Sequence, residues 1–421
     1  MSVSSSAYLH AGCTMRSSRF EKRMSQGRTF VREFVRLPDY LFAVGITLLG
    51  SLLLRVRALT AKTAESSEVL VVGTNRVWAG IEVYASEMMN CGWKYTVIVE
   101  EAGSLTRKHS AIDARLAVLP RRSIHSAVIT CFAALWRGVH IVEFYNFGNP
   151  LLHAFYGQLV RCSHFPISVI FTGADLLYWE SRPLRSRIIR MTADRAHFAL
   201  FKEPYMAAVL EEHSIAVNSQ RVEIRNSVRD KAATSSLSFH AKRLVFLNSF
   251  KAFRNIDYLL AEMQHAVRLD SEISLDLIGY RNQSEYERVA KLVDTLSLHE
   301  FVRIQPFTAN PLESFQGKSL FVLPADHVYL NNSTIEAMSV GLPVMLNSDA
   351  ASVEKIVPDD RTGFLVPLIP KAWARRIVDV VNDPELLSVV GLNGKIHVTA
   401  SFSSTEVGSY LNSLYLDSRA C

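Results

Sequence analysis

The residues best suited to chemistry form a polar turn between two apolar runs in LFVLPADHVYLNNSTIEAMSVGLPVML, residues 320–346. A helix is expected to begin in this turn, with Asn332 or Ser333 as its N-cap, and to end at Gly341. The backbone N–H groups and the positive dipole end of such a helix favour a diphosphate group. Asn331, Asn332 and Ser333 are therefore candidate residues for binding a diphosphate.

Glu336 lies one turn inside the same predicted helix. From there its carboxylate would reach ribose hydroxyls beside a bound diphosphate. The alternative is a glutamate that only caps the helix or faces water.

Short β-rich runs alternate with helical stretches from Glu68 onward, which predicts parallel sheets covered by helices. A polar, serine-rich stretch at 230–242 separates two series of such runs and has the composition of a linker. The predicted strands of the first series are 69–72, 95–99, 139–143, 167–171 and 198–201, and those of the second are 244–247, 274–278, 302–305, 320–323, 343–346 and 364–366.

The pattern predicts an α/β protein with two doubly wound, Rossmann-like domains facing a cleft, in which ligands bind at the carboxyl ends of the strands. We expect a basic arm with a short apolar segment over 1–66 and an N-terminal Rossmann-like domain over 67–238. A C-terminal Rossmann-like domain would follow over 239–395, and a last segment would cover 396–421.

Composition excludes several classes of protein. The 421 residues are 49% hydrophobic and 20% charged, as in globular proteins rather than disordered ones. The five cysteines and the scattered histidines show no metal-ligand spacing and no disulfide framework, so we expect neither a metal nor a cofactor and a reducing, cytoplasmic compartment. Residues 67–421 carry 36 basic and 36 acidic residues, and this neutrality argues against a nucleic-acid-binding body.

The net charge of +6 resides in residues 1–66, which hold ten basic and four acidic residues. Tyr40 to Leu54 forms an uncharged run that as a helix is about 22 Å long, against about 30 Å for a hydrocarbon core. Residues 16–57 are therefore expected to meet the inner face of a membrane, peripherally or by shallow insertion. A helix docked on the body, or a true single span, is the alternative. An apolar helix over 124–136 has the same two interpretations, membrane docking or core packing.

The segment from Glu336 onward resembles the C-terminal signature of the retaining family-4 glycosyltransferases, which have the GT-B fold. The matching residues are Glu336-Ala337-Met338, Gly341, Pro343-Val344, Glu354 and Gly363 to Val366. The similarity extends over residues 67–417, since Gly73-Thr74 and Ala79 to Glu82 resemble the glycine-rich loop of that family. Phe171 to Asp175 resembles its strand ending in H-G-x-D, and Val222 to Val228 resembles its strand at the domain junction.

The resemblance implies that residues 67–238 form the acceptor domain, that 239–395 form the nucleotide-sugar domain, and that a helix over 396–421 crosses back to the first domain. It also implies roles for individual residues. Gly80 would lie against the donor, Asn146 and Gly173 would line the acceptor side, and Asp175 would orient an acceptor hydroxyl or accept its proton. Lys251 and Arg254 would neutralise the leaving diphosphate.

Four positions depart from the family pattern. Val328 replaces the first of its two glutamates and Ser249 replaces its arginine. Thr172 replaces the histidine before G-x-D, and Ser352 replaces the glycine of the downstream G-x-E. Asp359 and Asp360 are interpreted as a turn before a strand rather than as a metal site.

The implied function is metal-independent transfer of a sugar from a nucleotide diphosphate sugar to a glycan or lipid-linked acceptor, with retention of configuration and no nucleic acid partner. A catalytically impaired subunit that binds nucleotide or glycan and scaffolds a synthesis complex is the main alternative. An epimerase or hydrolase of nucleotide sugars, and nucleic-acid binding by the arm alone, are the others.

Overall fold

The structure is a computed structural model that describes residues 37–60, 68–73, 88–99, 116–120, 124–145, 150–163, 165–171, 183–202, 204–224, 226–228, 237, 239–308, 311–326, 331–350 and 353–417. The linker prediction at 230–242 lies largely outside these residues.

The first half of the chain forms a seven-stranded parallel sheet in the order β3-β2-β1-β4-β5-β6-β7. Its strands are short and, apart from the edge strand β7, consist mostly of apolar residues, as expected of parallel strands buried on both faces. They are β1 (Glu68–Gly73), β2 (Lys94–Val99), β3 (Leu116–Pro120), β4 (Ile141–Tyr145), β5 (Ile167–Ile170), β6 (Phe198–Phe201) and β7 (Gln220–Glu223). The helices of this half are α5 (Ile124–Arg137), α6 (Pro150–Ser163), α8 (Pro183–Ala193) and α9 (Pro204–Glu212).

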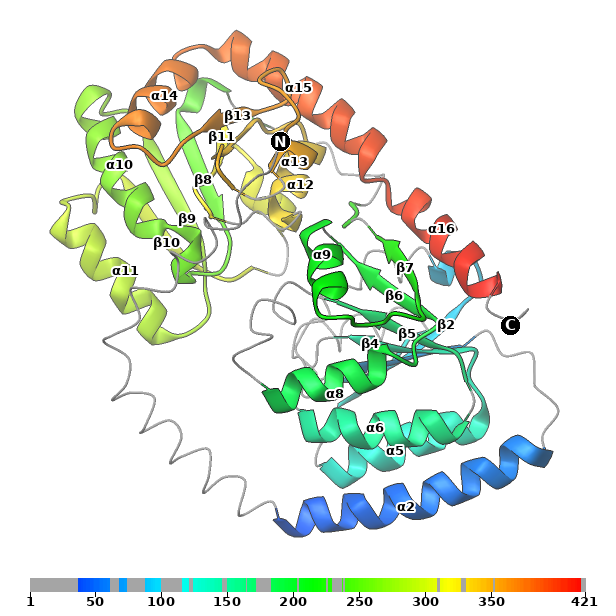
Figure 1. Cartoon of the computed structure of the whole chain (residues 1–421). Coiled ribbons are helices and arrows are strands. Elements are labelled where there is room, and N and C mark those ends of the chain that lie inside the picture. The colour runs from blue at the N-terminus through cyan, green and yellow to red at the C-terminus, as the bar shows by residue number, and fades with distance from the viewer. Residues whose placement is uncertain are drawn as a thin grey trace.

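The second half forms a six-stranded parallel sheet in the order β10-β9-β8-β11-β12-β13. The strands are β8 (Arg243–Leu247), β9 (Ser274–Tyr280), β10 (Val302–Pro306), β11 (Leu320–Leu323), β12 (Val344–Asn347) and β13 (Phe364–Val366). The helices are α10 (Ile256–Leu269), α11 (Gln283–Thr295), α12 (Asn332–Ser339), α13 (Val353–Ile356), α14 (Ala372–Val381) and α15 (Pro384–Ser401), with short 3-10 turns at Phe239–Ala241, Ala252–Arg254 and Pro311–Phe315. The predicted class, two Rossmann-like α/β domains, is confirmed (Figure 1).

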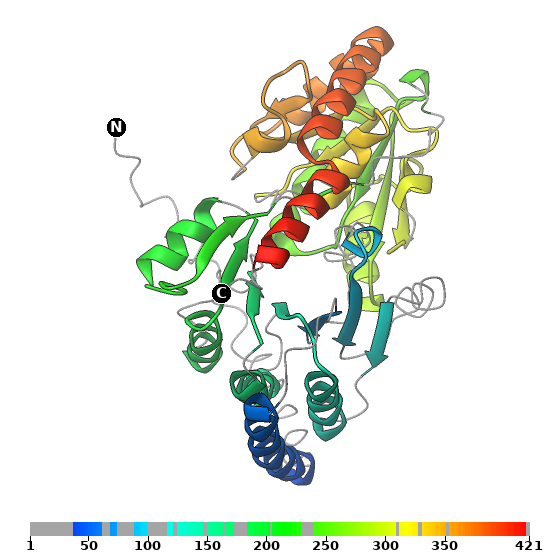
Figure 2. The same ribbon diagram turned by 90° about the vertical axis from the view of Figure 1, so that its right-hand side faces the viewer.

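The last helix, α16 (Ser404–Asp417), lies on the first sheet although it follows the second in sequence (Figures 1 and 2). Leu411, Leu414 and Tyr415 belong to the same apolar core as Trp93 and Tyr95. The helix therefore covers one face of the first sheet, while α5 and α6 contribute to the core on the other.

The segment that links the two halves and the segment that precedes α16 are joined by one backbone bridge. The Val228 N–H donates to Phe402 O at 3.0 Å, and the Ser404 N–H donates to Val228 O at 3.1 Å. An ion pair also joins the two halves. The Lys355 ammonium of the second half pairs at 2.5 Å with the carboxylate of Glu223, which lies close to Val228 in the sequence.

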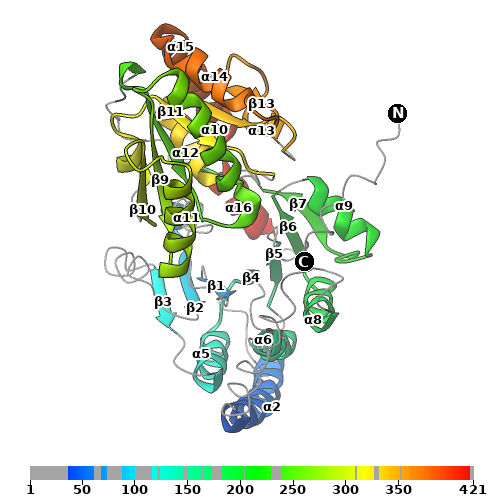
Figure 3. The same ribbon diagram turned by 90° about the vertical axis from the view of Figure 1, so that its left-hand side faces the viewer.

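Helix α2 (Leu37–Thr60) lies outside α5 and α6 as an added layer, visible at the bottom of Figures 1, 2 and 3. Within the described residues, no helix is both long enough and apolar enough to span a membrane. The helix is docked on the body, as one of the sequence alternatives stated, and α5 is largely a core helix.

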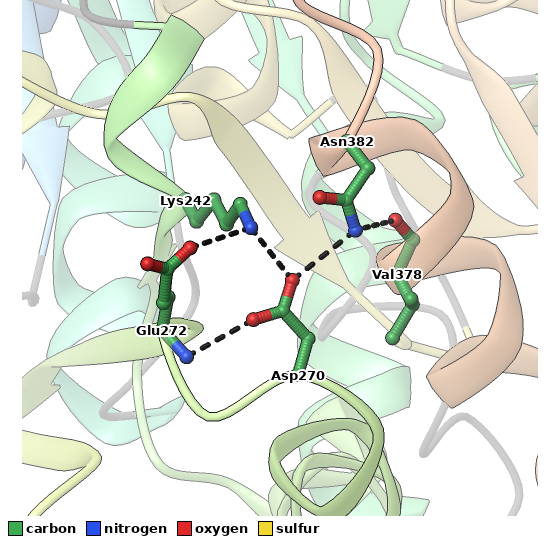
Figure 4. A network of polar contacts seen from close by, with 5 residues as sticks. All are labelled: Lys242, Asp270, Glu272, Val378 and Asn382. Carbon is green, nitrogen blue, oxygen red and sulfur yellow. Dashed lines mark hydrogen bonds and ion pairs between the residues drawn. The ribbon is translucent and has the colours of Figure 1, made fainter.

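A polar network fastens the start of the second sheet to two helix ends (Figure 4). Lys242, at the entry to β8, pairs with Asp270 at 2.8 Å and with Glu272 at 2.7 Å. Asp270 is the C-cap of α10 and also accepts a hydrogen bond from Asn382, the C-cap of α14, at 3.1 Å. These ion pairs and hydrogen bonds lower the pKa of Asp270 and raise that of Lys242.

Candidate functional site

Helix α12 begins one residue earlier than the sequence indicates, because Asn331 is its N-cap. The Asn331 carboxamide oxygen accepts a hydrogen bond from the Thr334 N–H at 3.2 Å, so the expectation of Asn332 or Ser333 as the cap is wrong. All three side chains can accept such a bond, and the backbone decides which does. The predicted end is confirmed: Gly341 has φ +88°, and its N–H bonds Met338 O at 2.9 Å.

The N-terminal turn of α12 holds two polar oxygens that are unusual for a buried position. Asn332 Oδ1 and Thr334 Oγ1 are both inaccessible to water and have no hydrogen-bond partner among the described residues. Buried oxygens of this kind are normally satisfied. Ser333 and Glu336, both half-buried, lie on the first and second turns of the same helix. The turn thus offers polar groups and a positive dipole end to a ligand.

The segment after β8 brings the two cations into the site. Lys251 is exposed, and Arg254 is buried with its guanidinium 4.7 Å from the centre of the Phe253 ring. Asn255 has left-handed backbone geometry and donates through Nδ2 to Pro324 O at 2.9 Å and to Asp326 Oδ1 at 2.6 Å.

The Asp326 N–H in turn donates to Phe253 O at 3.0 Å. This loop is therefore tied to the residues that follow β11, where the chain leads on to α12. Because β8 and β11 are parallel neighbours, the two cations lie at the same sheet edge as the segment that leads to α12.

Two residues that sequence reasoning missed fix the shape of this edge. Gly279, at the end of β9, has φ +142°, and a Cβ there would lie 1.8 Å from Asn248 O, so only glycine is compatible with it. Asn347, at the end of β12, is buried and donates through Nδ2 to Ala325 O at 3.3 Å. A strand run that ends in glycine or asparagine was the available signal for both.

Several predicted site residues lie outside the described residues: Gly80, Asn146, Gly173, Asp175 and Val328. The remaining predicted residues follow β8 and β11 in the second domain: Lys251, Arg254, Asn331, Asn332, Ser333 and Glu336. The acceptor side stays a prediction.

The turn predicted at Asp359 and Asp360 is confirmed, since it leads directly into β13. Hydrogen bonds from the Arg361 guanidinium and the Thr362 hydroxyl lower the pKa of Asp359, so this carboxylate is occupied within its own turn. Among the described residues, no group of three histidine, cysteine or acidic side chains is placed to hold a metal.

Comparisons with known proteins find similar sequences for part of the second domain. Residues 241–383 match the sequence model of the family described as glycosyl transferases group 1. This stretch contains the six candidate site residues of the second domain. A capsular polysaccharide biosynthesis glycosyltransferase of Staphylococcus aureus, CapM, is 30% identical over 108 residues, which are 25% of this chain and 28% of that protein. The matched segment thus spans less than a third of that relative.

Solved structures match over most of the chain. HepE of Anabaena, in complex with UDP and glucose, superposes with a TM-score of 0.70 at 12% identity, over 83% of this chain and 99% of that one. The chain therefore has the GT-B fold. The sucrose-phosphate synthase of Thermosynechococcus elongatus gives a TM-score of 0.66 at 16% identity, over 84% and 99% of the two chains. At such low identities the likeness concerns the fold alone.

Proposed function

We propose that the protein is a glycosyltransferase in polysaccharide or glycoconjugate biosynthesis. It would be a retaining, metal-independent enzyme of family 4 that transfers a hexosyl group from a nucleotide diphosphate sugar to a glycan or lipid-linked acceptor. One observation carries the proposal. At the carboxyl ends of β8 and β11, the loop that holds Lys251 and Arg254 contacts the segment that leads into α12. This edge lies within the segment that matches the glycosyl transferases group 1 family.

In the proposed reaction, the bond from the anomeric carbon to the diphosphate breaks and a bond to the acceptor oxygen forms. Backbone N–H groups at the start of α12, with Asn332 and Ser333, bind the diphosphate, and Glu336 binds the ribose. Lys251 and Arg254 stabilise the negative charge that develops on the departing diphosphate.

The acceptor side of the proposal rests on the first domain. Gly80 lies against the donor, and Asn146 and Gly173 line the acceptor. Asp175 orients the attacking hydroxyl or takes its proton. HepE was crystallised with UDP and glucose, which supports a nucleotide sugar as donor for this fold. We place the reaction at the inner face of a membrane, where a lipid-linked acceptor would be found.

Turnover by the full chain tests the proposal. Purified protein is incubated with nucleotide sugars and with lipid-linked or soluble acceptors, and the anomeric configuration of the product is read by NMR. A product with retained configuration, formed with a chelator present, is expected. Lys251→Ala should lower kcat by about a hundredfold. Lys291→Ala, an exposed lysine on α11, is the matched control and should leave kcat unchanged.

The scaffold alternative is favoured by one observation, Val328 at the position of the first motif glutamate. Tight nucleotide binding without turnover, across all common donors and acceptors, would contradict the transferase proposal and support the scaffold.

A further inference from the structure

Helix α2 turns mainly small and polar residues toward the protein and most of its large apolar residues outward. The residues on its buried face are Ala43, Thr47, Gly50, Ser51 and Leu54. The outward face, here called the α2 apolar face, consists of Leu41, Phe42, Val44, Leu48, Leu49, Leu52, Leu53 and Val56. A helix on the surface of a soluble domain shows the opposite arrangement.

Close packing fixes this orientation. A Cβ at Gly50 would lie 2.9 Å from a ring carbon of Phe132 on α5, so the α2 backbone lies directly against its neighbour. At the other end, Arg57 donates to Leu135 O of α5 at 2.7 Å, and its guanidinium lies 5.6 Å from the Trp136 ring centre. The helix therefore cannot rotate its apolar face inward.

The α2 apolar face is wide and uncharged. At about 100° per residue, its exposed positions between 41 and 53 cover roughly 180° of the helix circumference, and no charged residue occurs between Tyr40 and Leu54. One packed helix covers a stripe of about 100°, whereas lipid surrounds any exposed arc. Exposed Arg55 lies near the end of this face, just before Val56, and basic residues at 22, 23, 28, 32 and 36 precede the face in the sequence.

We propose that the α2 apolar face inserts into the boundary between head groups and acyl chains of an anionic bilayer, with α2 parallel to the membrane plane. Spanning does not fit, because the uncharged run is about 22 Å long against about 30 Å of hydrocarbon and the helix is fastened to α5 and α6. Trp136 is 44% exposed and lies beside Arg57. Aromatic and basic residues of this kind are common at membrane interfaces. This inference deepens the membrane part of the proposed function, but it rests on α2 and not on sugar transfer.

Flotation of the full-length protein with vesicles tests the inference. The vesicles are phosphatidylcholine alone, or phosphatidylcholine mixed with phosphatidylglycerol. Wild-type protein should float with the mixed vesicles and less with the neutral ones. The variant Leu48→Gln/Leu49→Gln/Leu52→Gln should lower the partition coefficient by about a hundredfold. Because all three side chains face outward, this variant should fold, and circular dichroism checks that it does.

The α15 helix supplies the matched control. Val389, Leu392 and Ile396 are 57%, 59% and 60% exposed, close to 65%, 61% and 60% for Leu48, Leu49 and Leu52. Replacing these three by glutamine should leave flotation unchanged.

Equal flotation of the α2 variant and wild type would overturn the inference, as would wild-type protein that stays in solution or binds neutral and anionic vesicles equally. Wild-type dimers in light scattering that the α2 variant abolishes would assign the face to a second copy instead. Flotation without turnover would contradict only the transferase proposal.

Discussion

The Tyr415 hydroxyl donates a hydrogen bond to the carboxylate of Glu143, although 272 residues separate them in the sequence. Glu143 lies in β4 of the first sheet, and Tyr415 lies near the end of α16; both are fully buried. Two further contacts accompany this bond. Trp93 Nε1 donates to Asn412 Oδ1 at 2.7 Å, and His140 Nε2 lies 2.7 Å from Tyr415 O. The end of the chain is thereby fastened to the core of its first half.

Tyr415→Phe should therefore destabilise the protein by about 1–3 kcal/mol, because Glu143 loses a buried donor. Burial and the nearby Glu143 raise the pKa of Tyr415 well above its usual value, so the hydroxyl stays a protonated donor near neutral pH. Urea unfolding measures the loss. Tyr410→Phe is the control, since Tyr410 is an exposed tyrosine on the same helix, and equal effects of the two variants would contradict the assigned role.

Glu336→Ala should abolish stabilisation by the cognate nucleotide without lowering the melting temperature of the free protein appreciably, because Glu336 is only half-buried. A ligand at about 100 times its Kd stabilises by about 2.7 kcal/mol. A thermal-shift panel of UDP, GDP, ADP, CMP and their sugar conjugates gives the readout. Glu287→Ala, an exposed glutamate on α11, should respond like wild type; a nucleotide shift retained in Glu336→Ala would remove Glu336 from the site.

Asp270→Asn should destabilise the second domain in a pH-dependent way. The Lys242 ammonium holds the pKa of Asp270 below its ordinary value. A lowered folded-state pKa contributes stability above the unfolded-state pKa of about 4, and that stability is lost as pH falls through the folded-state value. Urea unfolding should show a deficit in Asp270→Asn at pH 7 that shrinks below about pH 4.

The exposed Asp294 on α11 provides the control for this experiment, and Asp294→Asn should show little deficit at either pH. A deficit in Asp270→Asn that stayed constant with pH would mean that the charge of Asp270 is irrelevant.

Gly391→Ala should destabilise the protein by about 1–3 kcal/mol or more. A Cβ at Gly391, inside α15, would lie 2.1 Å from Gly341 O, a backbone atom at the end of α12 that cannot move aside easily. Gly45→Ala is the matched control, because a Cβ at Gly45 in α2 has nothing within 4 Å. It should stabilise slightly through helix propensity. Thermal unfolding compares the two, and similar destabilisation of both would contradict the packing argument.

Sequence alone predicted the two parallel sheets because buried strands in such sheets are short apolar runs with clear boundaries. The same continuity hides the exact position of a strand. The run around Val139 was predicted as a strand over 139–143, whereas β4 is Ile141–Tyr145. Strand β3, Leu116–Pro120, was missed because its run ends in proline.

Sequence could predict the part of the candidate site on α12 because Asn331 to Glu336 lie on one local turn and helix. The contacts that position it were not. The bond from Asn255 to Asp326 joins residues 71 positions apart, and no periodicity indicates which loops meet. For α2, the sequence indicated an apolar run but not which side of it faces the protein.

Because α16 packs on the first sheet, that sheet is completed late in the synthesis of the chain. The first sheet leaves the ribosome early, yet one of its apolar faces, which includes Val71 and Tyr95, is completed by Leu411 and Tyr415 near the end of the chain. The first half therefore keeps an uncovered apolar face until α16 has been synthesised. Any chain that stops before Ser404 would leave this face exposed for good, so incomplete copies of the protein should aggregate rather than persist as a free first domain.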